Sequence, residues 1–255
     1  MKRILLCVAA GLWLAACSTT TTMESRPADQ PGRVDAQYKA QIHTDLAAEY
    51  YRLGSYKAAL DTVQLAIAAV PTYAPAYNMK GLVHMALGQD EQARQAFEQA
   101  LKVAPKDSES LNNYGGFLCQ HGDAKRAMEY FQLALANPLY NTPERALYNA
   151  GMCAKKTGDN SGAEDYFRGA VQRQPQFAPP LIELADIEFQ RGRGKEAEAR
   201  LQAYNALVPM PGAEALYLGA RIARANNDRT AEASYAQQLR RRFPDAPQTR
   251  LIGDR

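Results

Sequence analysis

Only a few residues in this sequence have side chains and spacings that suggest chemistry. Cys119 and His121 lie two residues apart in the stretch LNNYGGFLCQHGD, residues 111–123, which also contains the adjacent glycines Gly115 and Gly116. Thiolate and imidazole both bind zinc, but a zinc site needs three or four ligands, and this stretch supplies one pair. Because glycine inside a helix costs about 1 kcal/mol relative to alanine, the two glycines indicate either a tight thiol or metal site or a place where something packs closely.

The other residues of catalytic type form no enzyme motif. His43 and His84 are not part of an HExxH pattern, and the sequence has no GxSxG and no Walker A loop. The stretch RGRGKEAEAR, residues 191–200, lacks the GxxxxGK[ST] spacing of a phosphate-binding loop. We therefore predict that the protein is not an enzyme and has no catalytic residue, metal site or cofactor. His43 and His84 are expected to be packing residues, and His121 to be exposed in a turn.

A 34-residue repeat fills the body of the chain and supplies the elements that carry these residues. Pro71 and Pro105 are 34 residues apart, as are Pro175 and Pro209. These prolines define six frames, 40–73, 74–107, 108–141, 144–177, 178–211 and 212–245, with the insertion Thr142-Pro143 after the third. Position 8 of the frames is always small: Ala47, Gly81, Gly115, Gly151, Ala185 and Gly219. Position 20 is alanine in every frame, and position 24 is aromatic or aliphatic.

This pattern resembles the tetratricopeptide repeat, in which two antiparallel helices occupy 34 residues. We predict an all-α fold, a right-handed superhelical solenoid of six such repeats within a domain of residues 36–245. Small residues at positions 8 and 20 let the two helices of a repeat cross closely, and stacking of repeats buries the apolar faces. Gly115 then lies at a helix crossing, and Gly116, at position 9, faces the concave groove. Residues 246–255 read as a polar C-terminal tail that frays.

The N-terminus reads as a lipoprotein leader. Lys2 and Arg3 precede an apolar stretch, residues 4–15, that is too short to span a bilayer but fits a secretory signal peptide. Small residues directly before Cys17 resemble the lipobox of bacterial lipoproteins, which implies cleavage after residue 16 and lipidation of Cys17. The alternative is an ordinary signal peptide with a cysteine near its cleavage site. Residues 17–35 are polar and include Pro27 and Pro31, which predicts a flexible tether.

Charge and cysteine usage narrow the function further. The chain carries 30 basic and 27 acidic side chains, so loss of Lys2 and Arg3 with the leader leaves it close to neutral. Such a chain gives no support for nucleic-acid binding. Membrane attachment is expected through the lipid on Cys17 alone. Cys119 and Cys153 remain in the body, and in an oxidising compartment a disulfide between them is possible, although spacing alone does not establish it.

A groove lined by the first helices of the repeats is the best candidate for function. Positions 2, 5, 9, 12 and 13 of tetratricopeptide repeats tend to face it. The residues at these positions form a mixed, fairly apolar surface that suits an amphipathic helix or an extended peptide; alternatively, some of them pack between repeats. The predicted groove residues are Asn78, Leu82, Met85, Asn112, Gly116, Cys119, Tyr148, Met152, Ile182 and Phe189, with Lys155, Lys156 and Asp186 beside them.

One stretch is more specific than the repeat itself. Residues 111–154 contain NNYG, FLC before a glycine turn, NPLY followed by TP, and NAGMCA. They resemble the signature of the type IV pilus biogenesis and stability lipoproteins, PilF and PilW. The resemblance implies an outer-membrane pilotin on the periplasmic face, anchored by lipidated Cys17, that binds the secretin subunit and promotes its localisation and multimerisation for pilus assembly and twitching motility. It implies no catalytic residues.

The resemblance also gives the two cysteines of the body a common setting. Cys119 and Cys153 fall on the first helices of neighbouring repeats, so a disulfide between them is a hypothesis, beside the alternative of two small buried hydrophobic residues. The protein is expected to work as a monomer. A different function remains open, in which the repeats scaffold another envelope machine that assembles outer-membrane proteins or carries peptidoglycan enzymes.

Overall fold

The computed structural model describes residues 31–252, and within that range it contains thirteen α-helices and no β-strand. In chain order the helices are α1 (Pro31–Arg52), α2 (Tyr56–Ala69), α3 (Ala74–Ala86), α4 (Asp90–Val103), α5 (Ser108–Gln120), α6 (Ala124–Leu135), α7 (Pro143–Lys156), α8 (Asn160–Arg173), α9 (Pro179–Gln190), α10 (Gly194–Leu207), α11 (Ala213–Ala225), α12 (Arg229–Arg242) and α13 (Pro247–Leu251).

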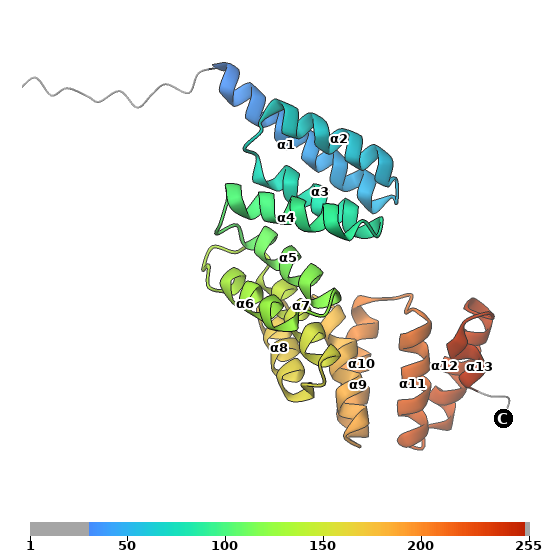
Figure 1. Cartoon of the computed structure of the whole chain (residues 1–255). Coiled ribbons are helices and arrows are strands. Elements are labelled where there is room, and N and C mark those ends of the chain that lie inside the picture. The colour runs from blue at the N-terminus through green and yellow to red at the C-terminus, as the bar shows by residue number, and fades with distance from the viewer. Residues whose placement is uncertain (1–30, 253–255) are drawn as a thin grey trace, which may run out of the picture.

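The helices form a stacked array of pairs. Each odd-numbered helix from α1 to α11 packs against the helix that follows it, and from α3 on it also packs against the preceding pair. Figure 1 shows the pairs side by side along a curved, elongated body that runs from α1 at one end to α12 and α13 at the other. The predicted all-helical solenoid of tetratricopeptide repeats is therefore confirmed.

The close crossing within each pair depends on position 8. A Cβ atom built on Gly115 would lie 2.8 Å from the Phe131 ring, and one built on Gly151 would lie 2.6 Å from the Phe167 ring. Gly81 and Gly219 stand in the same relation to Phe97 and Tyr235. Real Cβ contacts are longer than this, so the aromatic residue at position 24 occupies the space that a larger residue at position 8 would need.

Left-handed backbone at the end of the first helices explains the turn glycines. Gly122 has a φ of 88°, and φ is also positive at Gly54, Gly88, Gly158 and Gly192. In the sixth repeat the positive φ falls on Asn227, one position later in the frame. Asparagine is one of the few residues that adopts this conformation readily, so the sixth turn keeps the same geometry without a glycine.

Both ends of the domain extend further than the sequence indicated. Helix α1 begins at Pro31, inside the expected tether, because proline fits the first turn of a helix, where its missing N–H is not needed. Asp35 and Lys39 then pair at 2.9 Å one helical turn apart. The expected signal peptide, the lipidated Cys17 and the rest of the tether lie outside the described residues.

The expected frayed tail is wrong for residues 247–252. These residues form α13 and a final turn, and Ile252 is buried against Leu216, Ala220 and Leu239 of the sixth repeat. A terminal repeat without a neighbour exposes its apolar side, and here α13 covers it.

A buried ionic cluster joins α8 to α9 and the turn after α9. The Glu164 carboxylate accepts hydrogen bonds from Arg168 at 2.6 Å and from Arg191. The nearly inaccessible Glu188 is paired with Arg168 at 3.2 Å and with Arg193. Two buried carboxylates are tolerated here because three guanidinium groups surround them.

Candidate functional site

A groove runs across the first helices of the second, third and fourth repeats. It has a volume of about 610 Å³ and is lined by α3, α5 and α7. A second hollow of about 440 Å³ adjoins it and shares Leu82, Asn113 and Asn149 with it. The two together form the groove that is considered below.

The structure brings most of the predicted groove residues together here. Those that line the groove are Asn78, Leu82, Met85, Asn112, Gly116, Cys119, Tyr148 and Met152. Ile182 and Phe189 do not line it. They pack on a separate apolar cluster with Leu218 and Ile222, and Phe189 also lies beneath the Arg221 guanidinium at 4.7 Å. Both side chains are half-buried between the fifth and sixth repeats, and their place in a surface that binds a partner stays a prediction.

A chain of four asparagine side chains crosses the groove. The Asn149 amide donates to Asn112 at 2.9 Å, Asn112 donates to Asn113 at 3.3 Å, and Asn113 donates to Asn78 at 3.1 Å. Asn112 is only 2% exposed. Sequence reasoning missed Asn113 and Asn149, which both stand at position 6 of their repeats. Asparagine at the same position of two consecutive frames, in helices that stack, is the signal that could have indicated them.

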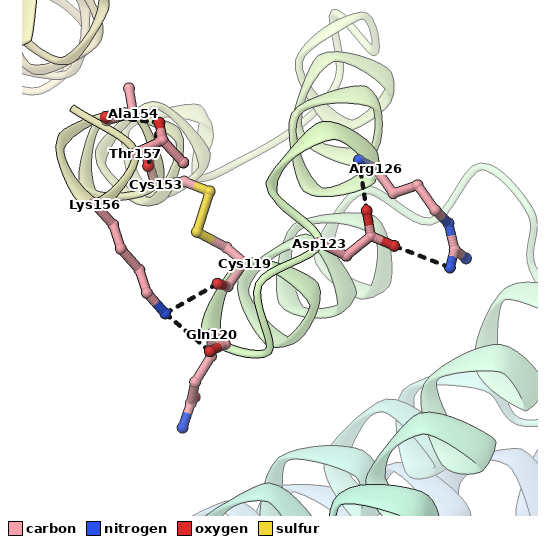
Figure 2. Close-up of a disulfide and its surroundings, with 8 residues drawn as sticks. All are labelled: Cys119, Gln120, Asp123, Arg126, Cys153, Ala154, Lys156 and Thr157. Carbon is pink, nitrogen blue, oxygen red and sulfur yellow. Dashed lines mark hydrogen bonds and ion pairs between the residues drawn. A yellow bond between two sulfur atoms is a disulfide. The ribbon is translucent and has the colours of Figure 1, made fainter. Parts of the chain in front are cut away.

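A disulfide joins the third and fourth repeats at the same place. Cys119 on α5 and Cys153 on α7 are bonded with an S–S distance of 2.06 Å, and both line the groove. Figure 2 shows this bond between the two helices, with Lys156 beside it reaching the end of α5. The Lys156 ammonium donates to the carbonyl oxygens of Cys119 and Gln120, at 3.1 and 2.8 Å. A cation there complements the negative end of the α5 dipole.

The second lysine of the groove is neutralised by carboxylates. The Lys155 ammonium lies 2.7 Å from Glu183 and 3.1 Å from Asp186 on α9. Partial burial alone lowers the pKa of Lys155, but hydrogen bonds and attraction from the two carboxylates outweigh it, so its pKa is raised overall. The lysine is therefore a fixed cation that ties α7 to α9.

The two glycines of the third repeat have different roles. Gly115 sits against Phe131, as described above, whereas a Cβ atom on Gly116 would meet nothing within 4 Å. Gly116 faces the groove between Leu82 and Met152. The absence of a side chain there leaves open space in the groove and is not required for packing.

The insertion before the fourth repeat is anchored beside the groove. Tyr140 is buried with Leu111, Ala134 and Ala146, and this burial raises the pKa of its phenol to about 12. The Thr142 hydroxyl donates to Glu109 at 2.6 Å across the junction. Tyr140 and the inserted Thr142 thus join the third and fourth repeats near the start of α5, whereas the disulfide joins them near the end of α5.

The remaining residues of catalytic type lie in packing or surface positions. His84 is buried with its Nδ1 atom 2.6 Å from Gln89, and His43 is half-buried. The His121 ring lies tilted against the Phe117 ring, beside Asp90. Among the described residues, no three His, Cys, Asp or Glu side chains are grouped as metal ligands would be. The larger hollow of the groove is lined by asparagine amides, methionine thioethers, a disulfide and two engaged lysines. These groups can contact a bound protein segment through hydrogen bonds and apolar packing. None of the helices between residues 31 and 252 is long and apolar enough to cross a membrane.

Two family models match the repeat array. Both are described as tetratricopeptide repeat, and they match residues 78–141 and 154–222. The type IV pilus assembly protein PilF of Pseudomonas aeruginosa is 25% identical over 233 residues, which are 91% of this chain and 90% of PilF.

Two solved structures extend this similarity to three dimensions. A solved structure of P. aeruginosa PilF superposes with a TM-score of 0.77 at 22% identity, covering 86% of this chain and 98% of that structure's chain, and shows the same fold. The crystal structure of PilW, described as a widely conserved type IV pilus biogenesis factor, superposes with a TM-score of 0.74 at 33% identity, covering 84% of this chain and 97% of PilW. The chain therefore belongs to the PilF/PilW family of tetratricopeptide-repeat proteins of type IV pilus biogenesis.

Proposed function

We propose that this protein is a pilotin of the type IV pilus system. It is an outer-membrane lipoprotein, anchored on the periplasmic face through Cys17, that binds the secretin subunit and promotes its localisation and multimerisation for pilus assembly and twitching motility. It acts as a monomeric, non-enzymatic binding protein.

The observation that carries this proposal is the position of residues 111–154 at the groove. Residues 111–154, whose motifs resemble PilF and PilW, supply most of the groove, both cysteines of the disulfide and the anchored insertion. Features shared by a family and gathered at one hollow on a repeat scaffold indicate a common binding site. The remaining repeats hold that site in shape.

Capture of a secretin from an envelope extract tests the proposal. Because α1 begins at Pro31, the bait comprises residues 18–255, which leaves the first helix intact. We expect the bait to recover a secretin subunit. Met152→Glu, at a groove residue that is 38% exposed, places a carboxylate in the binding surface and is expected to reduce recovery at least tenfold.

Met210→Glu is the matched control. Met210 is 78% exposed in the loop after α10 and lies away from the groove, so this variant should recover as much secretin as the wild-type bait. Equal loss in both variants, or recovery of barrel-assembly or cell-wall proteins without a secretin, would favour the scaffold of another envelope machine. Surface pili and twitching lost on deletion of the gene, without general envelope defects, are expected from the pilotin function.

A further inference from the structure

The groove contains a concentration of sulfur. Met85 on α3 and Met152 on α7 stand on either side of α5, and the Cys119–Cys153 disulfide lines the groove between them. Among the described residues that line the 610 Å³ hollow, none has an aromatic ring, whereas Tyr148 and Phe177 line the adjoining 440 Å³ hollow. Thioether and disulfide sulfur atoms are polarisable and make favourable contacts with the edges of aromatic rings.

We propose that the groove binds an extended, uncharged segment of the protein partner and receives one aromatic side chain of that segment over Gly116, between Met85 and Met152. This inference rests on the proposed function and names the chemistry that its groove recognises. It distinguishes an extended peptide with an aromatic anchor from an amphipathic helix.

Gly116 leaves open space in the lining of the groove. Nothing lies within 4 Å of a Cβ atom built on Gly116, and Leu82, Met85, Cys119 and Met152 line the same hollow. An aromatic side chain is flat and loses few rotamers when it is bound, which makes it the usual anchor at protein interfaces.

The asparagine chain favours an extended backbone. Its hydrogen bonds run in one direction from Asn149 to Asn78. The side-chain Oδ1 atom of Asn149 and the side-chain Nδ2 hydrogens of Asn78 therefore have no partner among the described residues. A carboxamide both donates and accepts, as a peptide unit does. An extended segment has free N–H and C=O groups to match it, whereas the groups of a helix are used internally.

Charge favours an uncharged segment. Lys155 is paired with Glu183 and Asp186, and Lys156 is held by the carbonyl oxygens at the end of α5. Among the described residues, the 610 Å³ hollow therefore has no carboxylate in its lining, and its two lysines are already engaged, which favours a neutral segment there. Glu109 and Arg145 line only the adjoining 440 Å³ hollow.

Selection from a library of phage-displayed 12-residue peptides on the immobilised full-length protein tests the inference. We expect the selected sequences to share one Phe, Tyr or Trp flanked by uncharged residues, without the spacing of an amphipathic helix. Gly116→Leu fills the opening and should weaken binding of a selected, fluorescein-labelled peptide at least tenfold in fluorescence polarisation.

Two controls separate recognition from folding. Ala48→Leu introduces the same side chain at position 9 of the first repeat, outside the groove, and should leave peptide binding unchanged. The double variant Met85→Leu and Met152→Leu conserves volume and should keep the thermal midpoint of the wild type. Its preference for a Phe peptide over the same peptide with Leu should fall about two- to tenfold, as expected for loss of sulfur–aromatic contacts.

Other results would overturn the inference. Selected peptides with charged or aliphatic anchors, equal binding to Gly116→Leu, or no selected peptide that depends on the groove each contradict it. If the wild-type bait and the Gly116→Leu bait capture equal amounts of secretin, this inference is contradicted and the pilotin function still stands. Aromatic peptides that bind the groove while no secretin is captured would do the reverse.

Discussion

At the scale of single residues, two neighbouring glycines of one helix have different structural roles. Gly115 and Gly116 are adjacent in α5, yet one contacts the Phe131 ring of the paired helix and the other borders the open groove. Packing within the repeat therefore requires Gly115, whereas no packing contact requires Gly116, which lines the groove. Because both are glycines in one helix interior, they allow the two requirements to be measured separately.

Alanine substitution at these two positions should have opposite effects. In Gly115→Ala the new Cβ atom lies 2.8 Å from the Phe131 ring and 3.2 Å from the Ala127 carbonyl oxygen, so we expect a loss of about 1–3 kcal/mol in the free energy of unfolding. Gly116→Ala meets no atom and removes a flexible residue from a helix, so it should gain up to about 1 kcal/mol. Urea denaturation of both variants measures this; equal effects would contradict it.

At the scale of helices, two different devices hold the central repeats together. The disulfide links α5 to α7, and the ionic cluster of Glu164 and Glu188 links α8 to the end of α9. Each joins elements that are adjacent in space and separated in sequence. In an array where each repeat contacts only its neighbours, such links set how firmly one repeat is coupled to the next.

The disulfide should be detectable in solution as protected thiols. Protein comprising residues 18–255, purified without reductant, is expected to resist alkylation of Cys119 and Cys153 until it is reduced under denaturing conditions, as mass spectrometry would show. Replacing both cysteines with alanine should lower the free energy of unfolding by about 2–4 kcal/mol, because the bond closes a loop across a separation of 34 residues. Two freely alkylated cysteines in the folded protein would be incompatible with this structure.

The ionic cluster should make the stability of the fold depend on pH in the acidic range. Burial alone raises the pKa of Glu164, but hydrogen bonds from Arg168 and Arg191 outweigh it and hold the pKa below its ordinary value of 4.5. The stabilisation is therefore present above pH 4.5 and is lost as the pH falls through the lowered pKa of the folded state. Thermal midpoints across this range should fall less steeply for Glu164→Gln than for the wild type. Parallel curves would show that Glu164 does not contribute.

At the scale of the whole molecule, the array needs a cover at its C-terminal end. Helix α13 and Ile252 supply it by packing on α11 and α12 (Figure 1). The end of a repeat array is its least supported part, because the last repeat has a neighbour on one side only. A short segment outside the repeat frame thus takes the place of a further repeat.

The two last apolar side chains provide a matched test of this cover. Ile252 is 7% exposed and Leu251 is 67% exposed. Ile252→Ala should lower the free energy of unfolding by about 2 kcal/mol, whereas Leu251→Ala should change it by less than about 0.5 kcal/mol. Hydrogen exchange of α12 amides, measured alongside, should rise only in Ile252→Ala. Equal stability of the two variants would mean that α13 does not cover the sixth repeat.

The sequence predicted the repeat more completely than it predicted the ends and the links between repeats. Gly151 and Phe167 recur with the period of the repeat, so their contact could be expected from spacing. The burial of Ile252 could not, because it lies outside every frame. Phe189 occupies a groove position by number, but it is half-buried against Leu218 and Ile222 of the sixth repeat, and such packing depends on how neighbouring repeats stack. The link between Asn112 and Asn149 likewise becomes visible only when the helices are placed side by side.

The covalent link between the third and fourth repeats has a consequence for a molecule under tension. If one end of the solenoid is held and the other is pulled, its helix pairs unfold and separate one after another. The bond between Cys119 and Cys153 keeps the intervening chain, a separation of 34 residues, from extending. The stretched molecule is then shorter by about 110 Å than a chain without the bond. When the C-terminal end is pulled and the sixth and fifth repeats unfold, the bond still joins α5 to α7, the two helices that carry most of the groove lining.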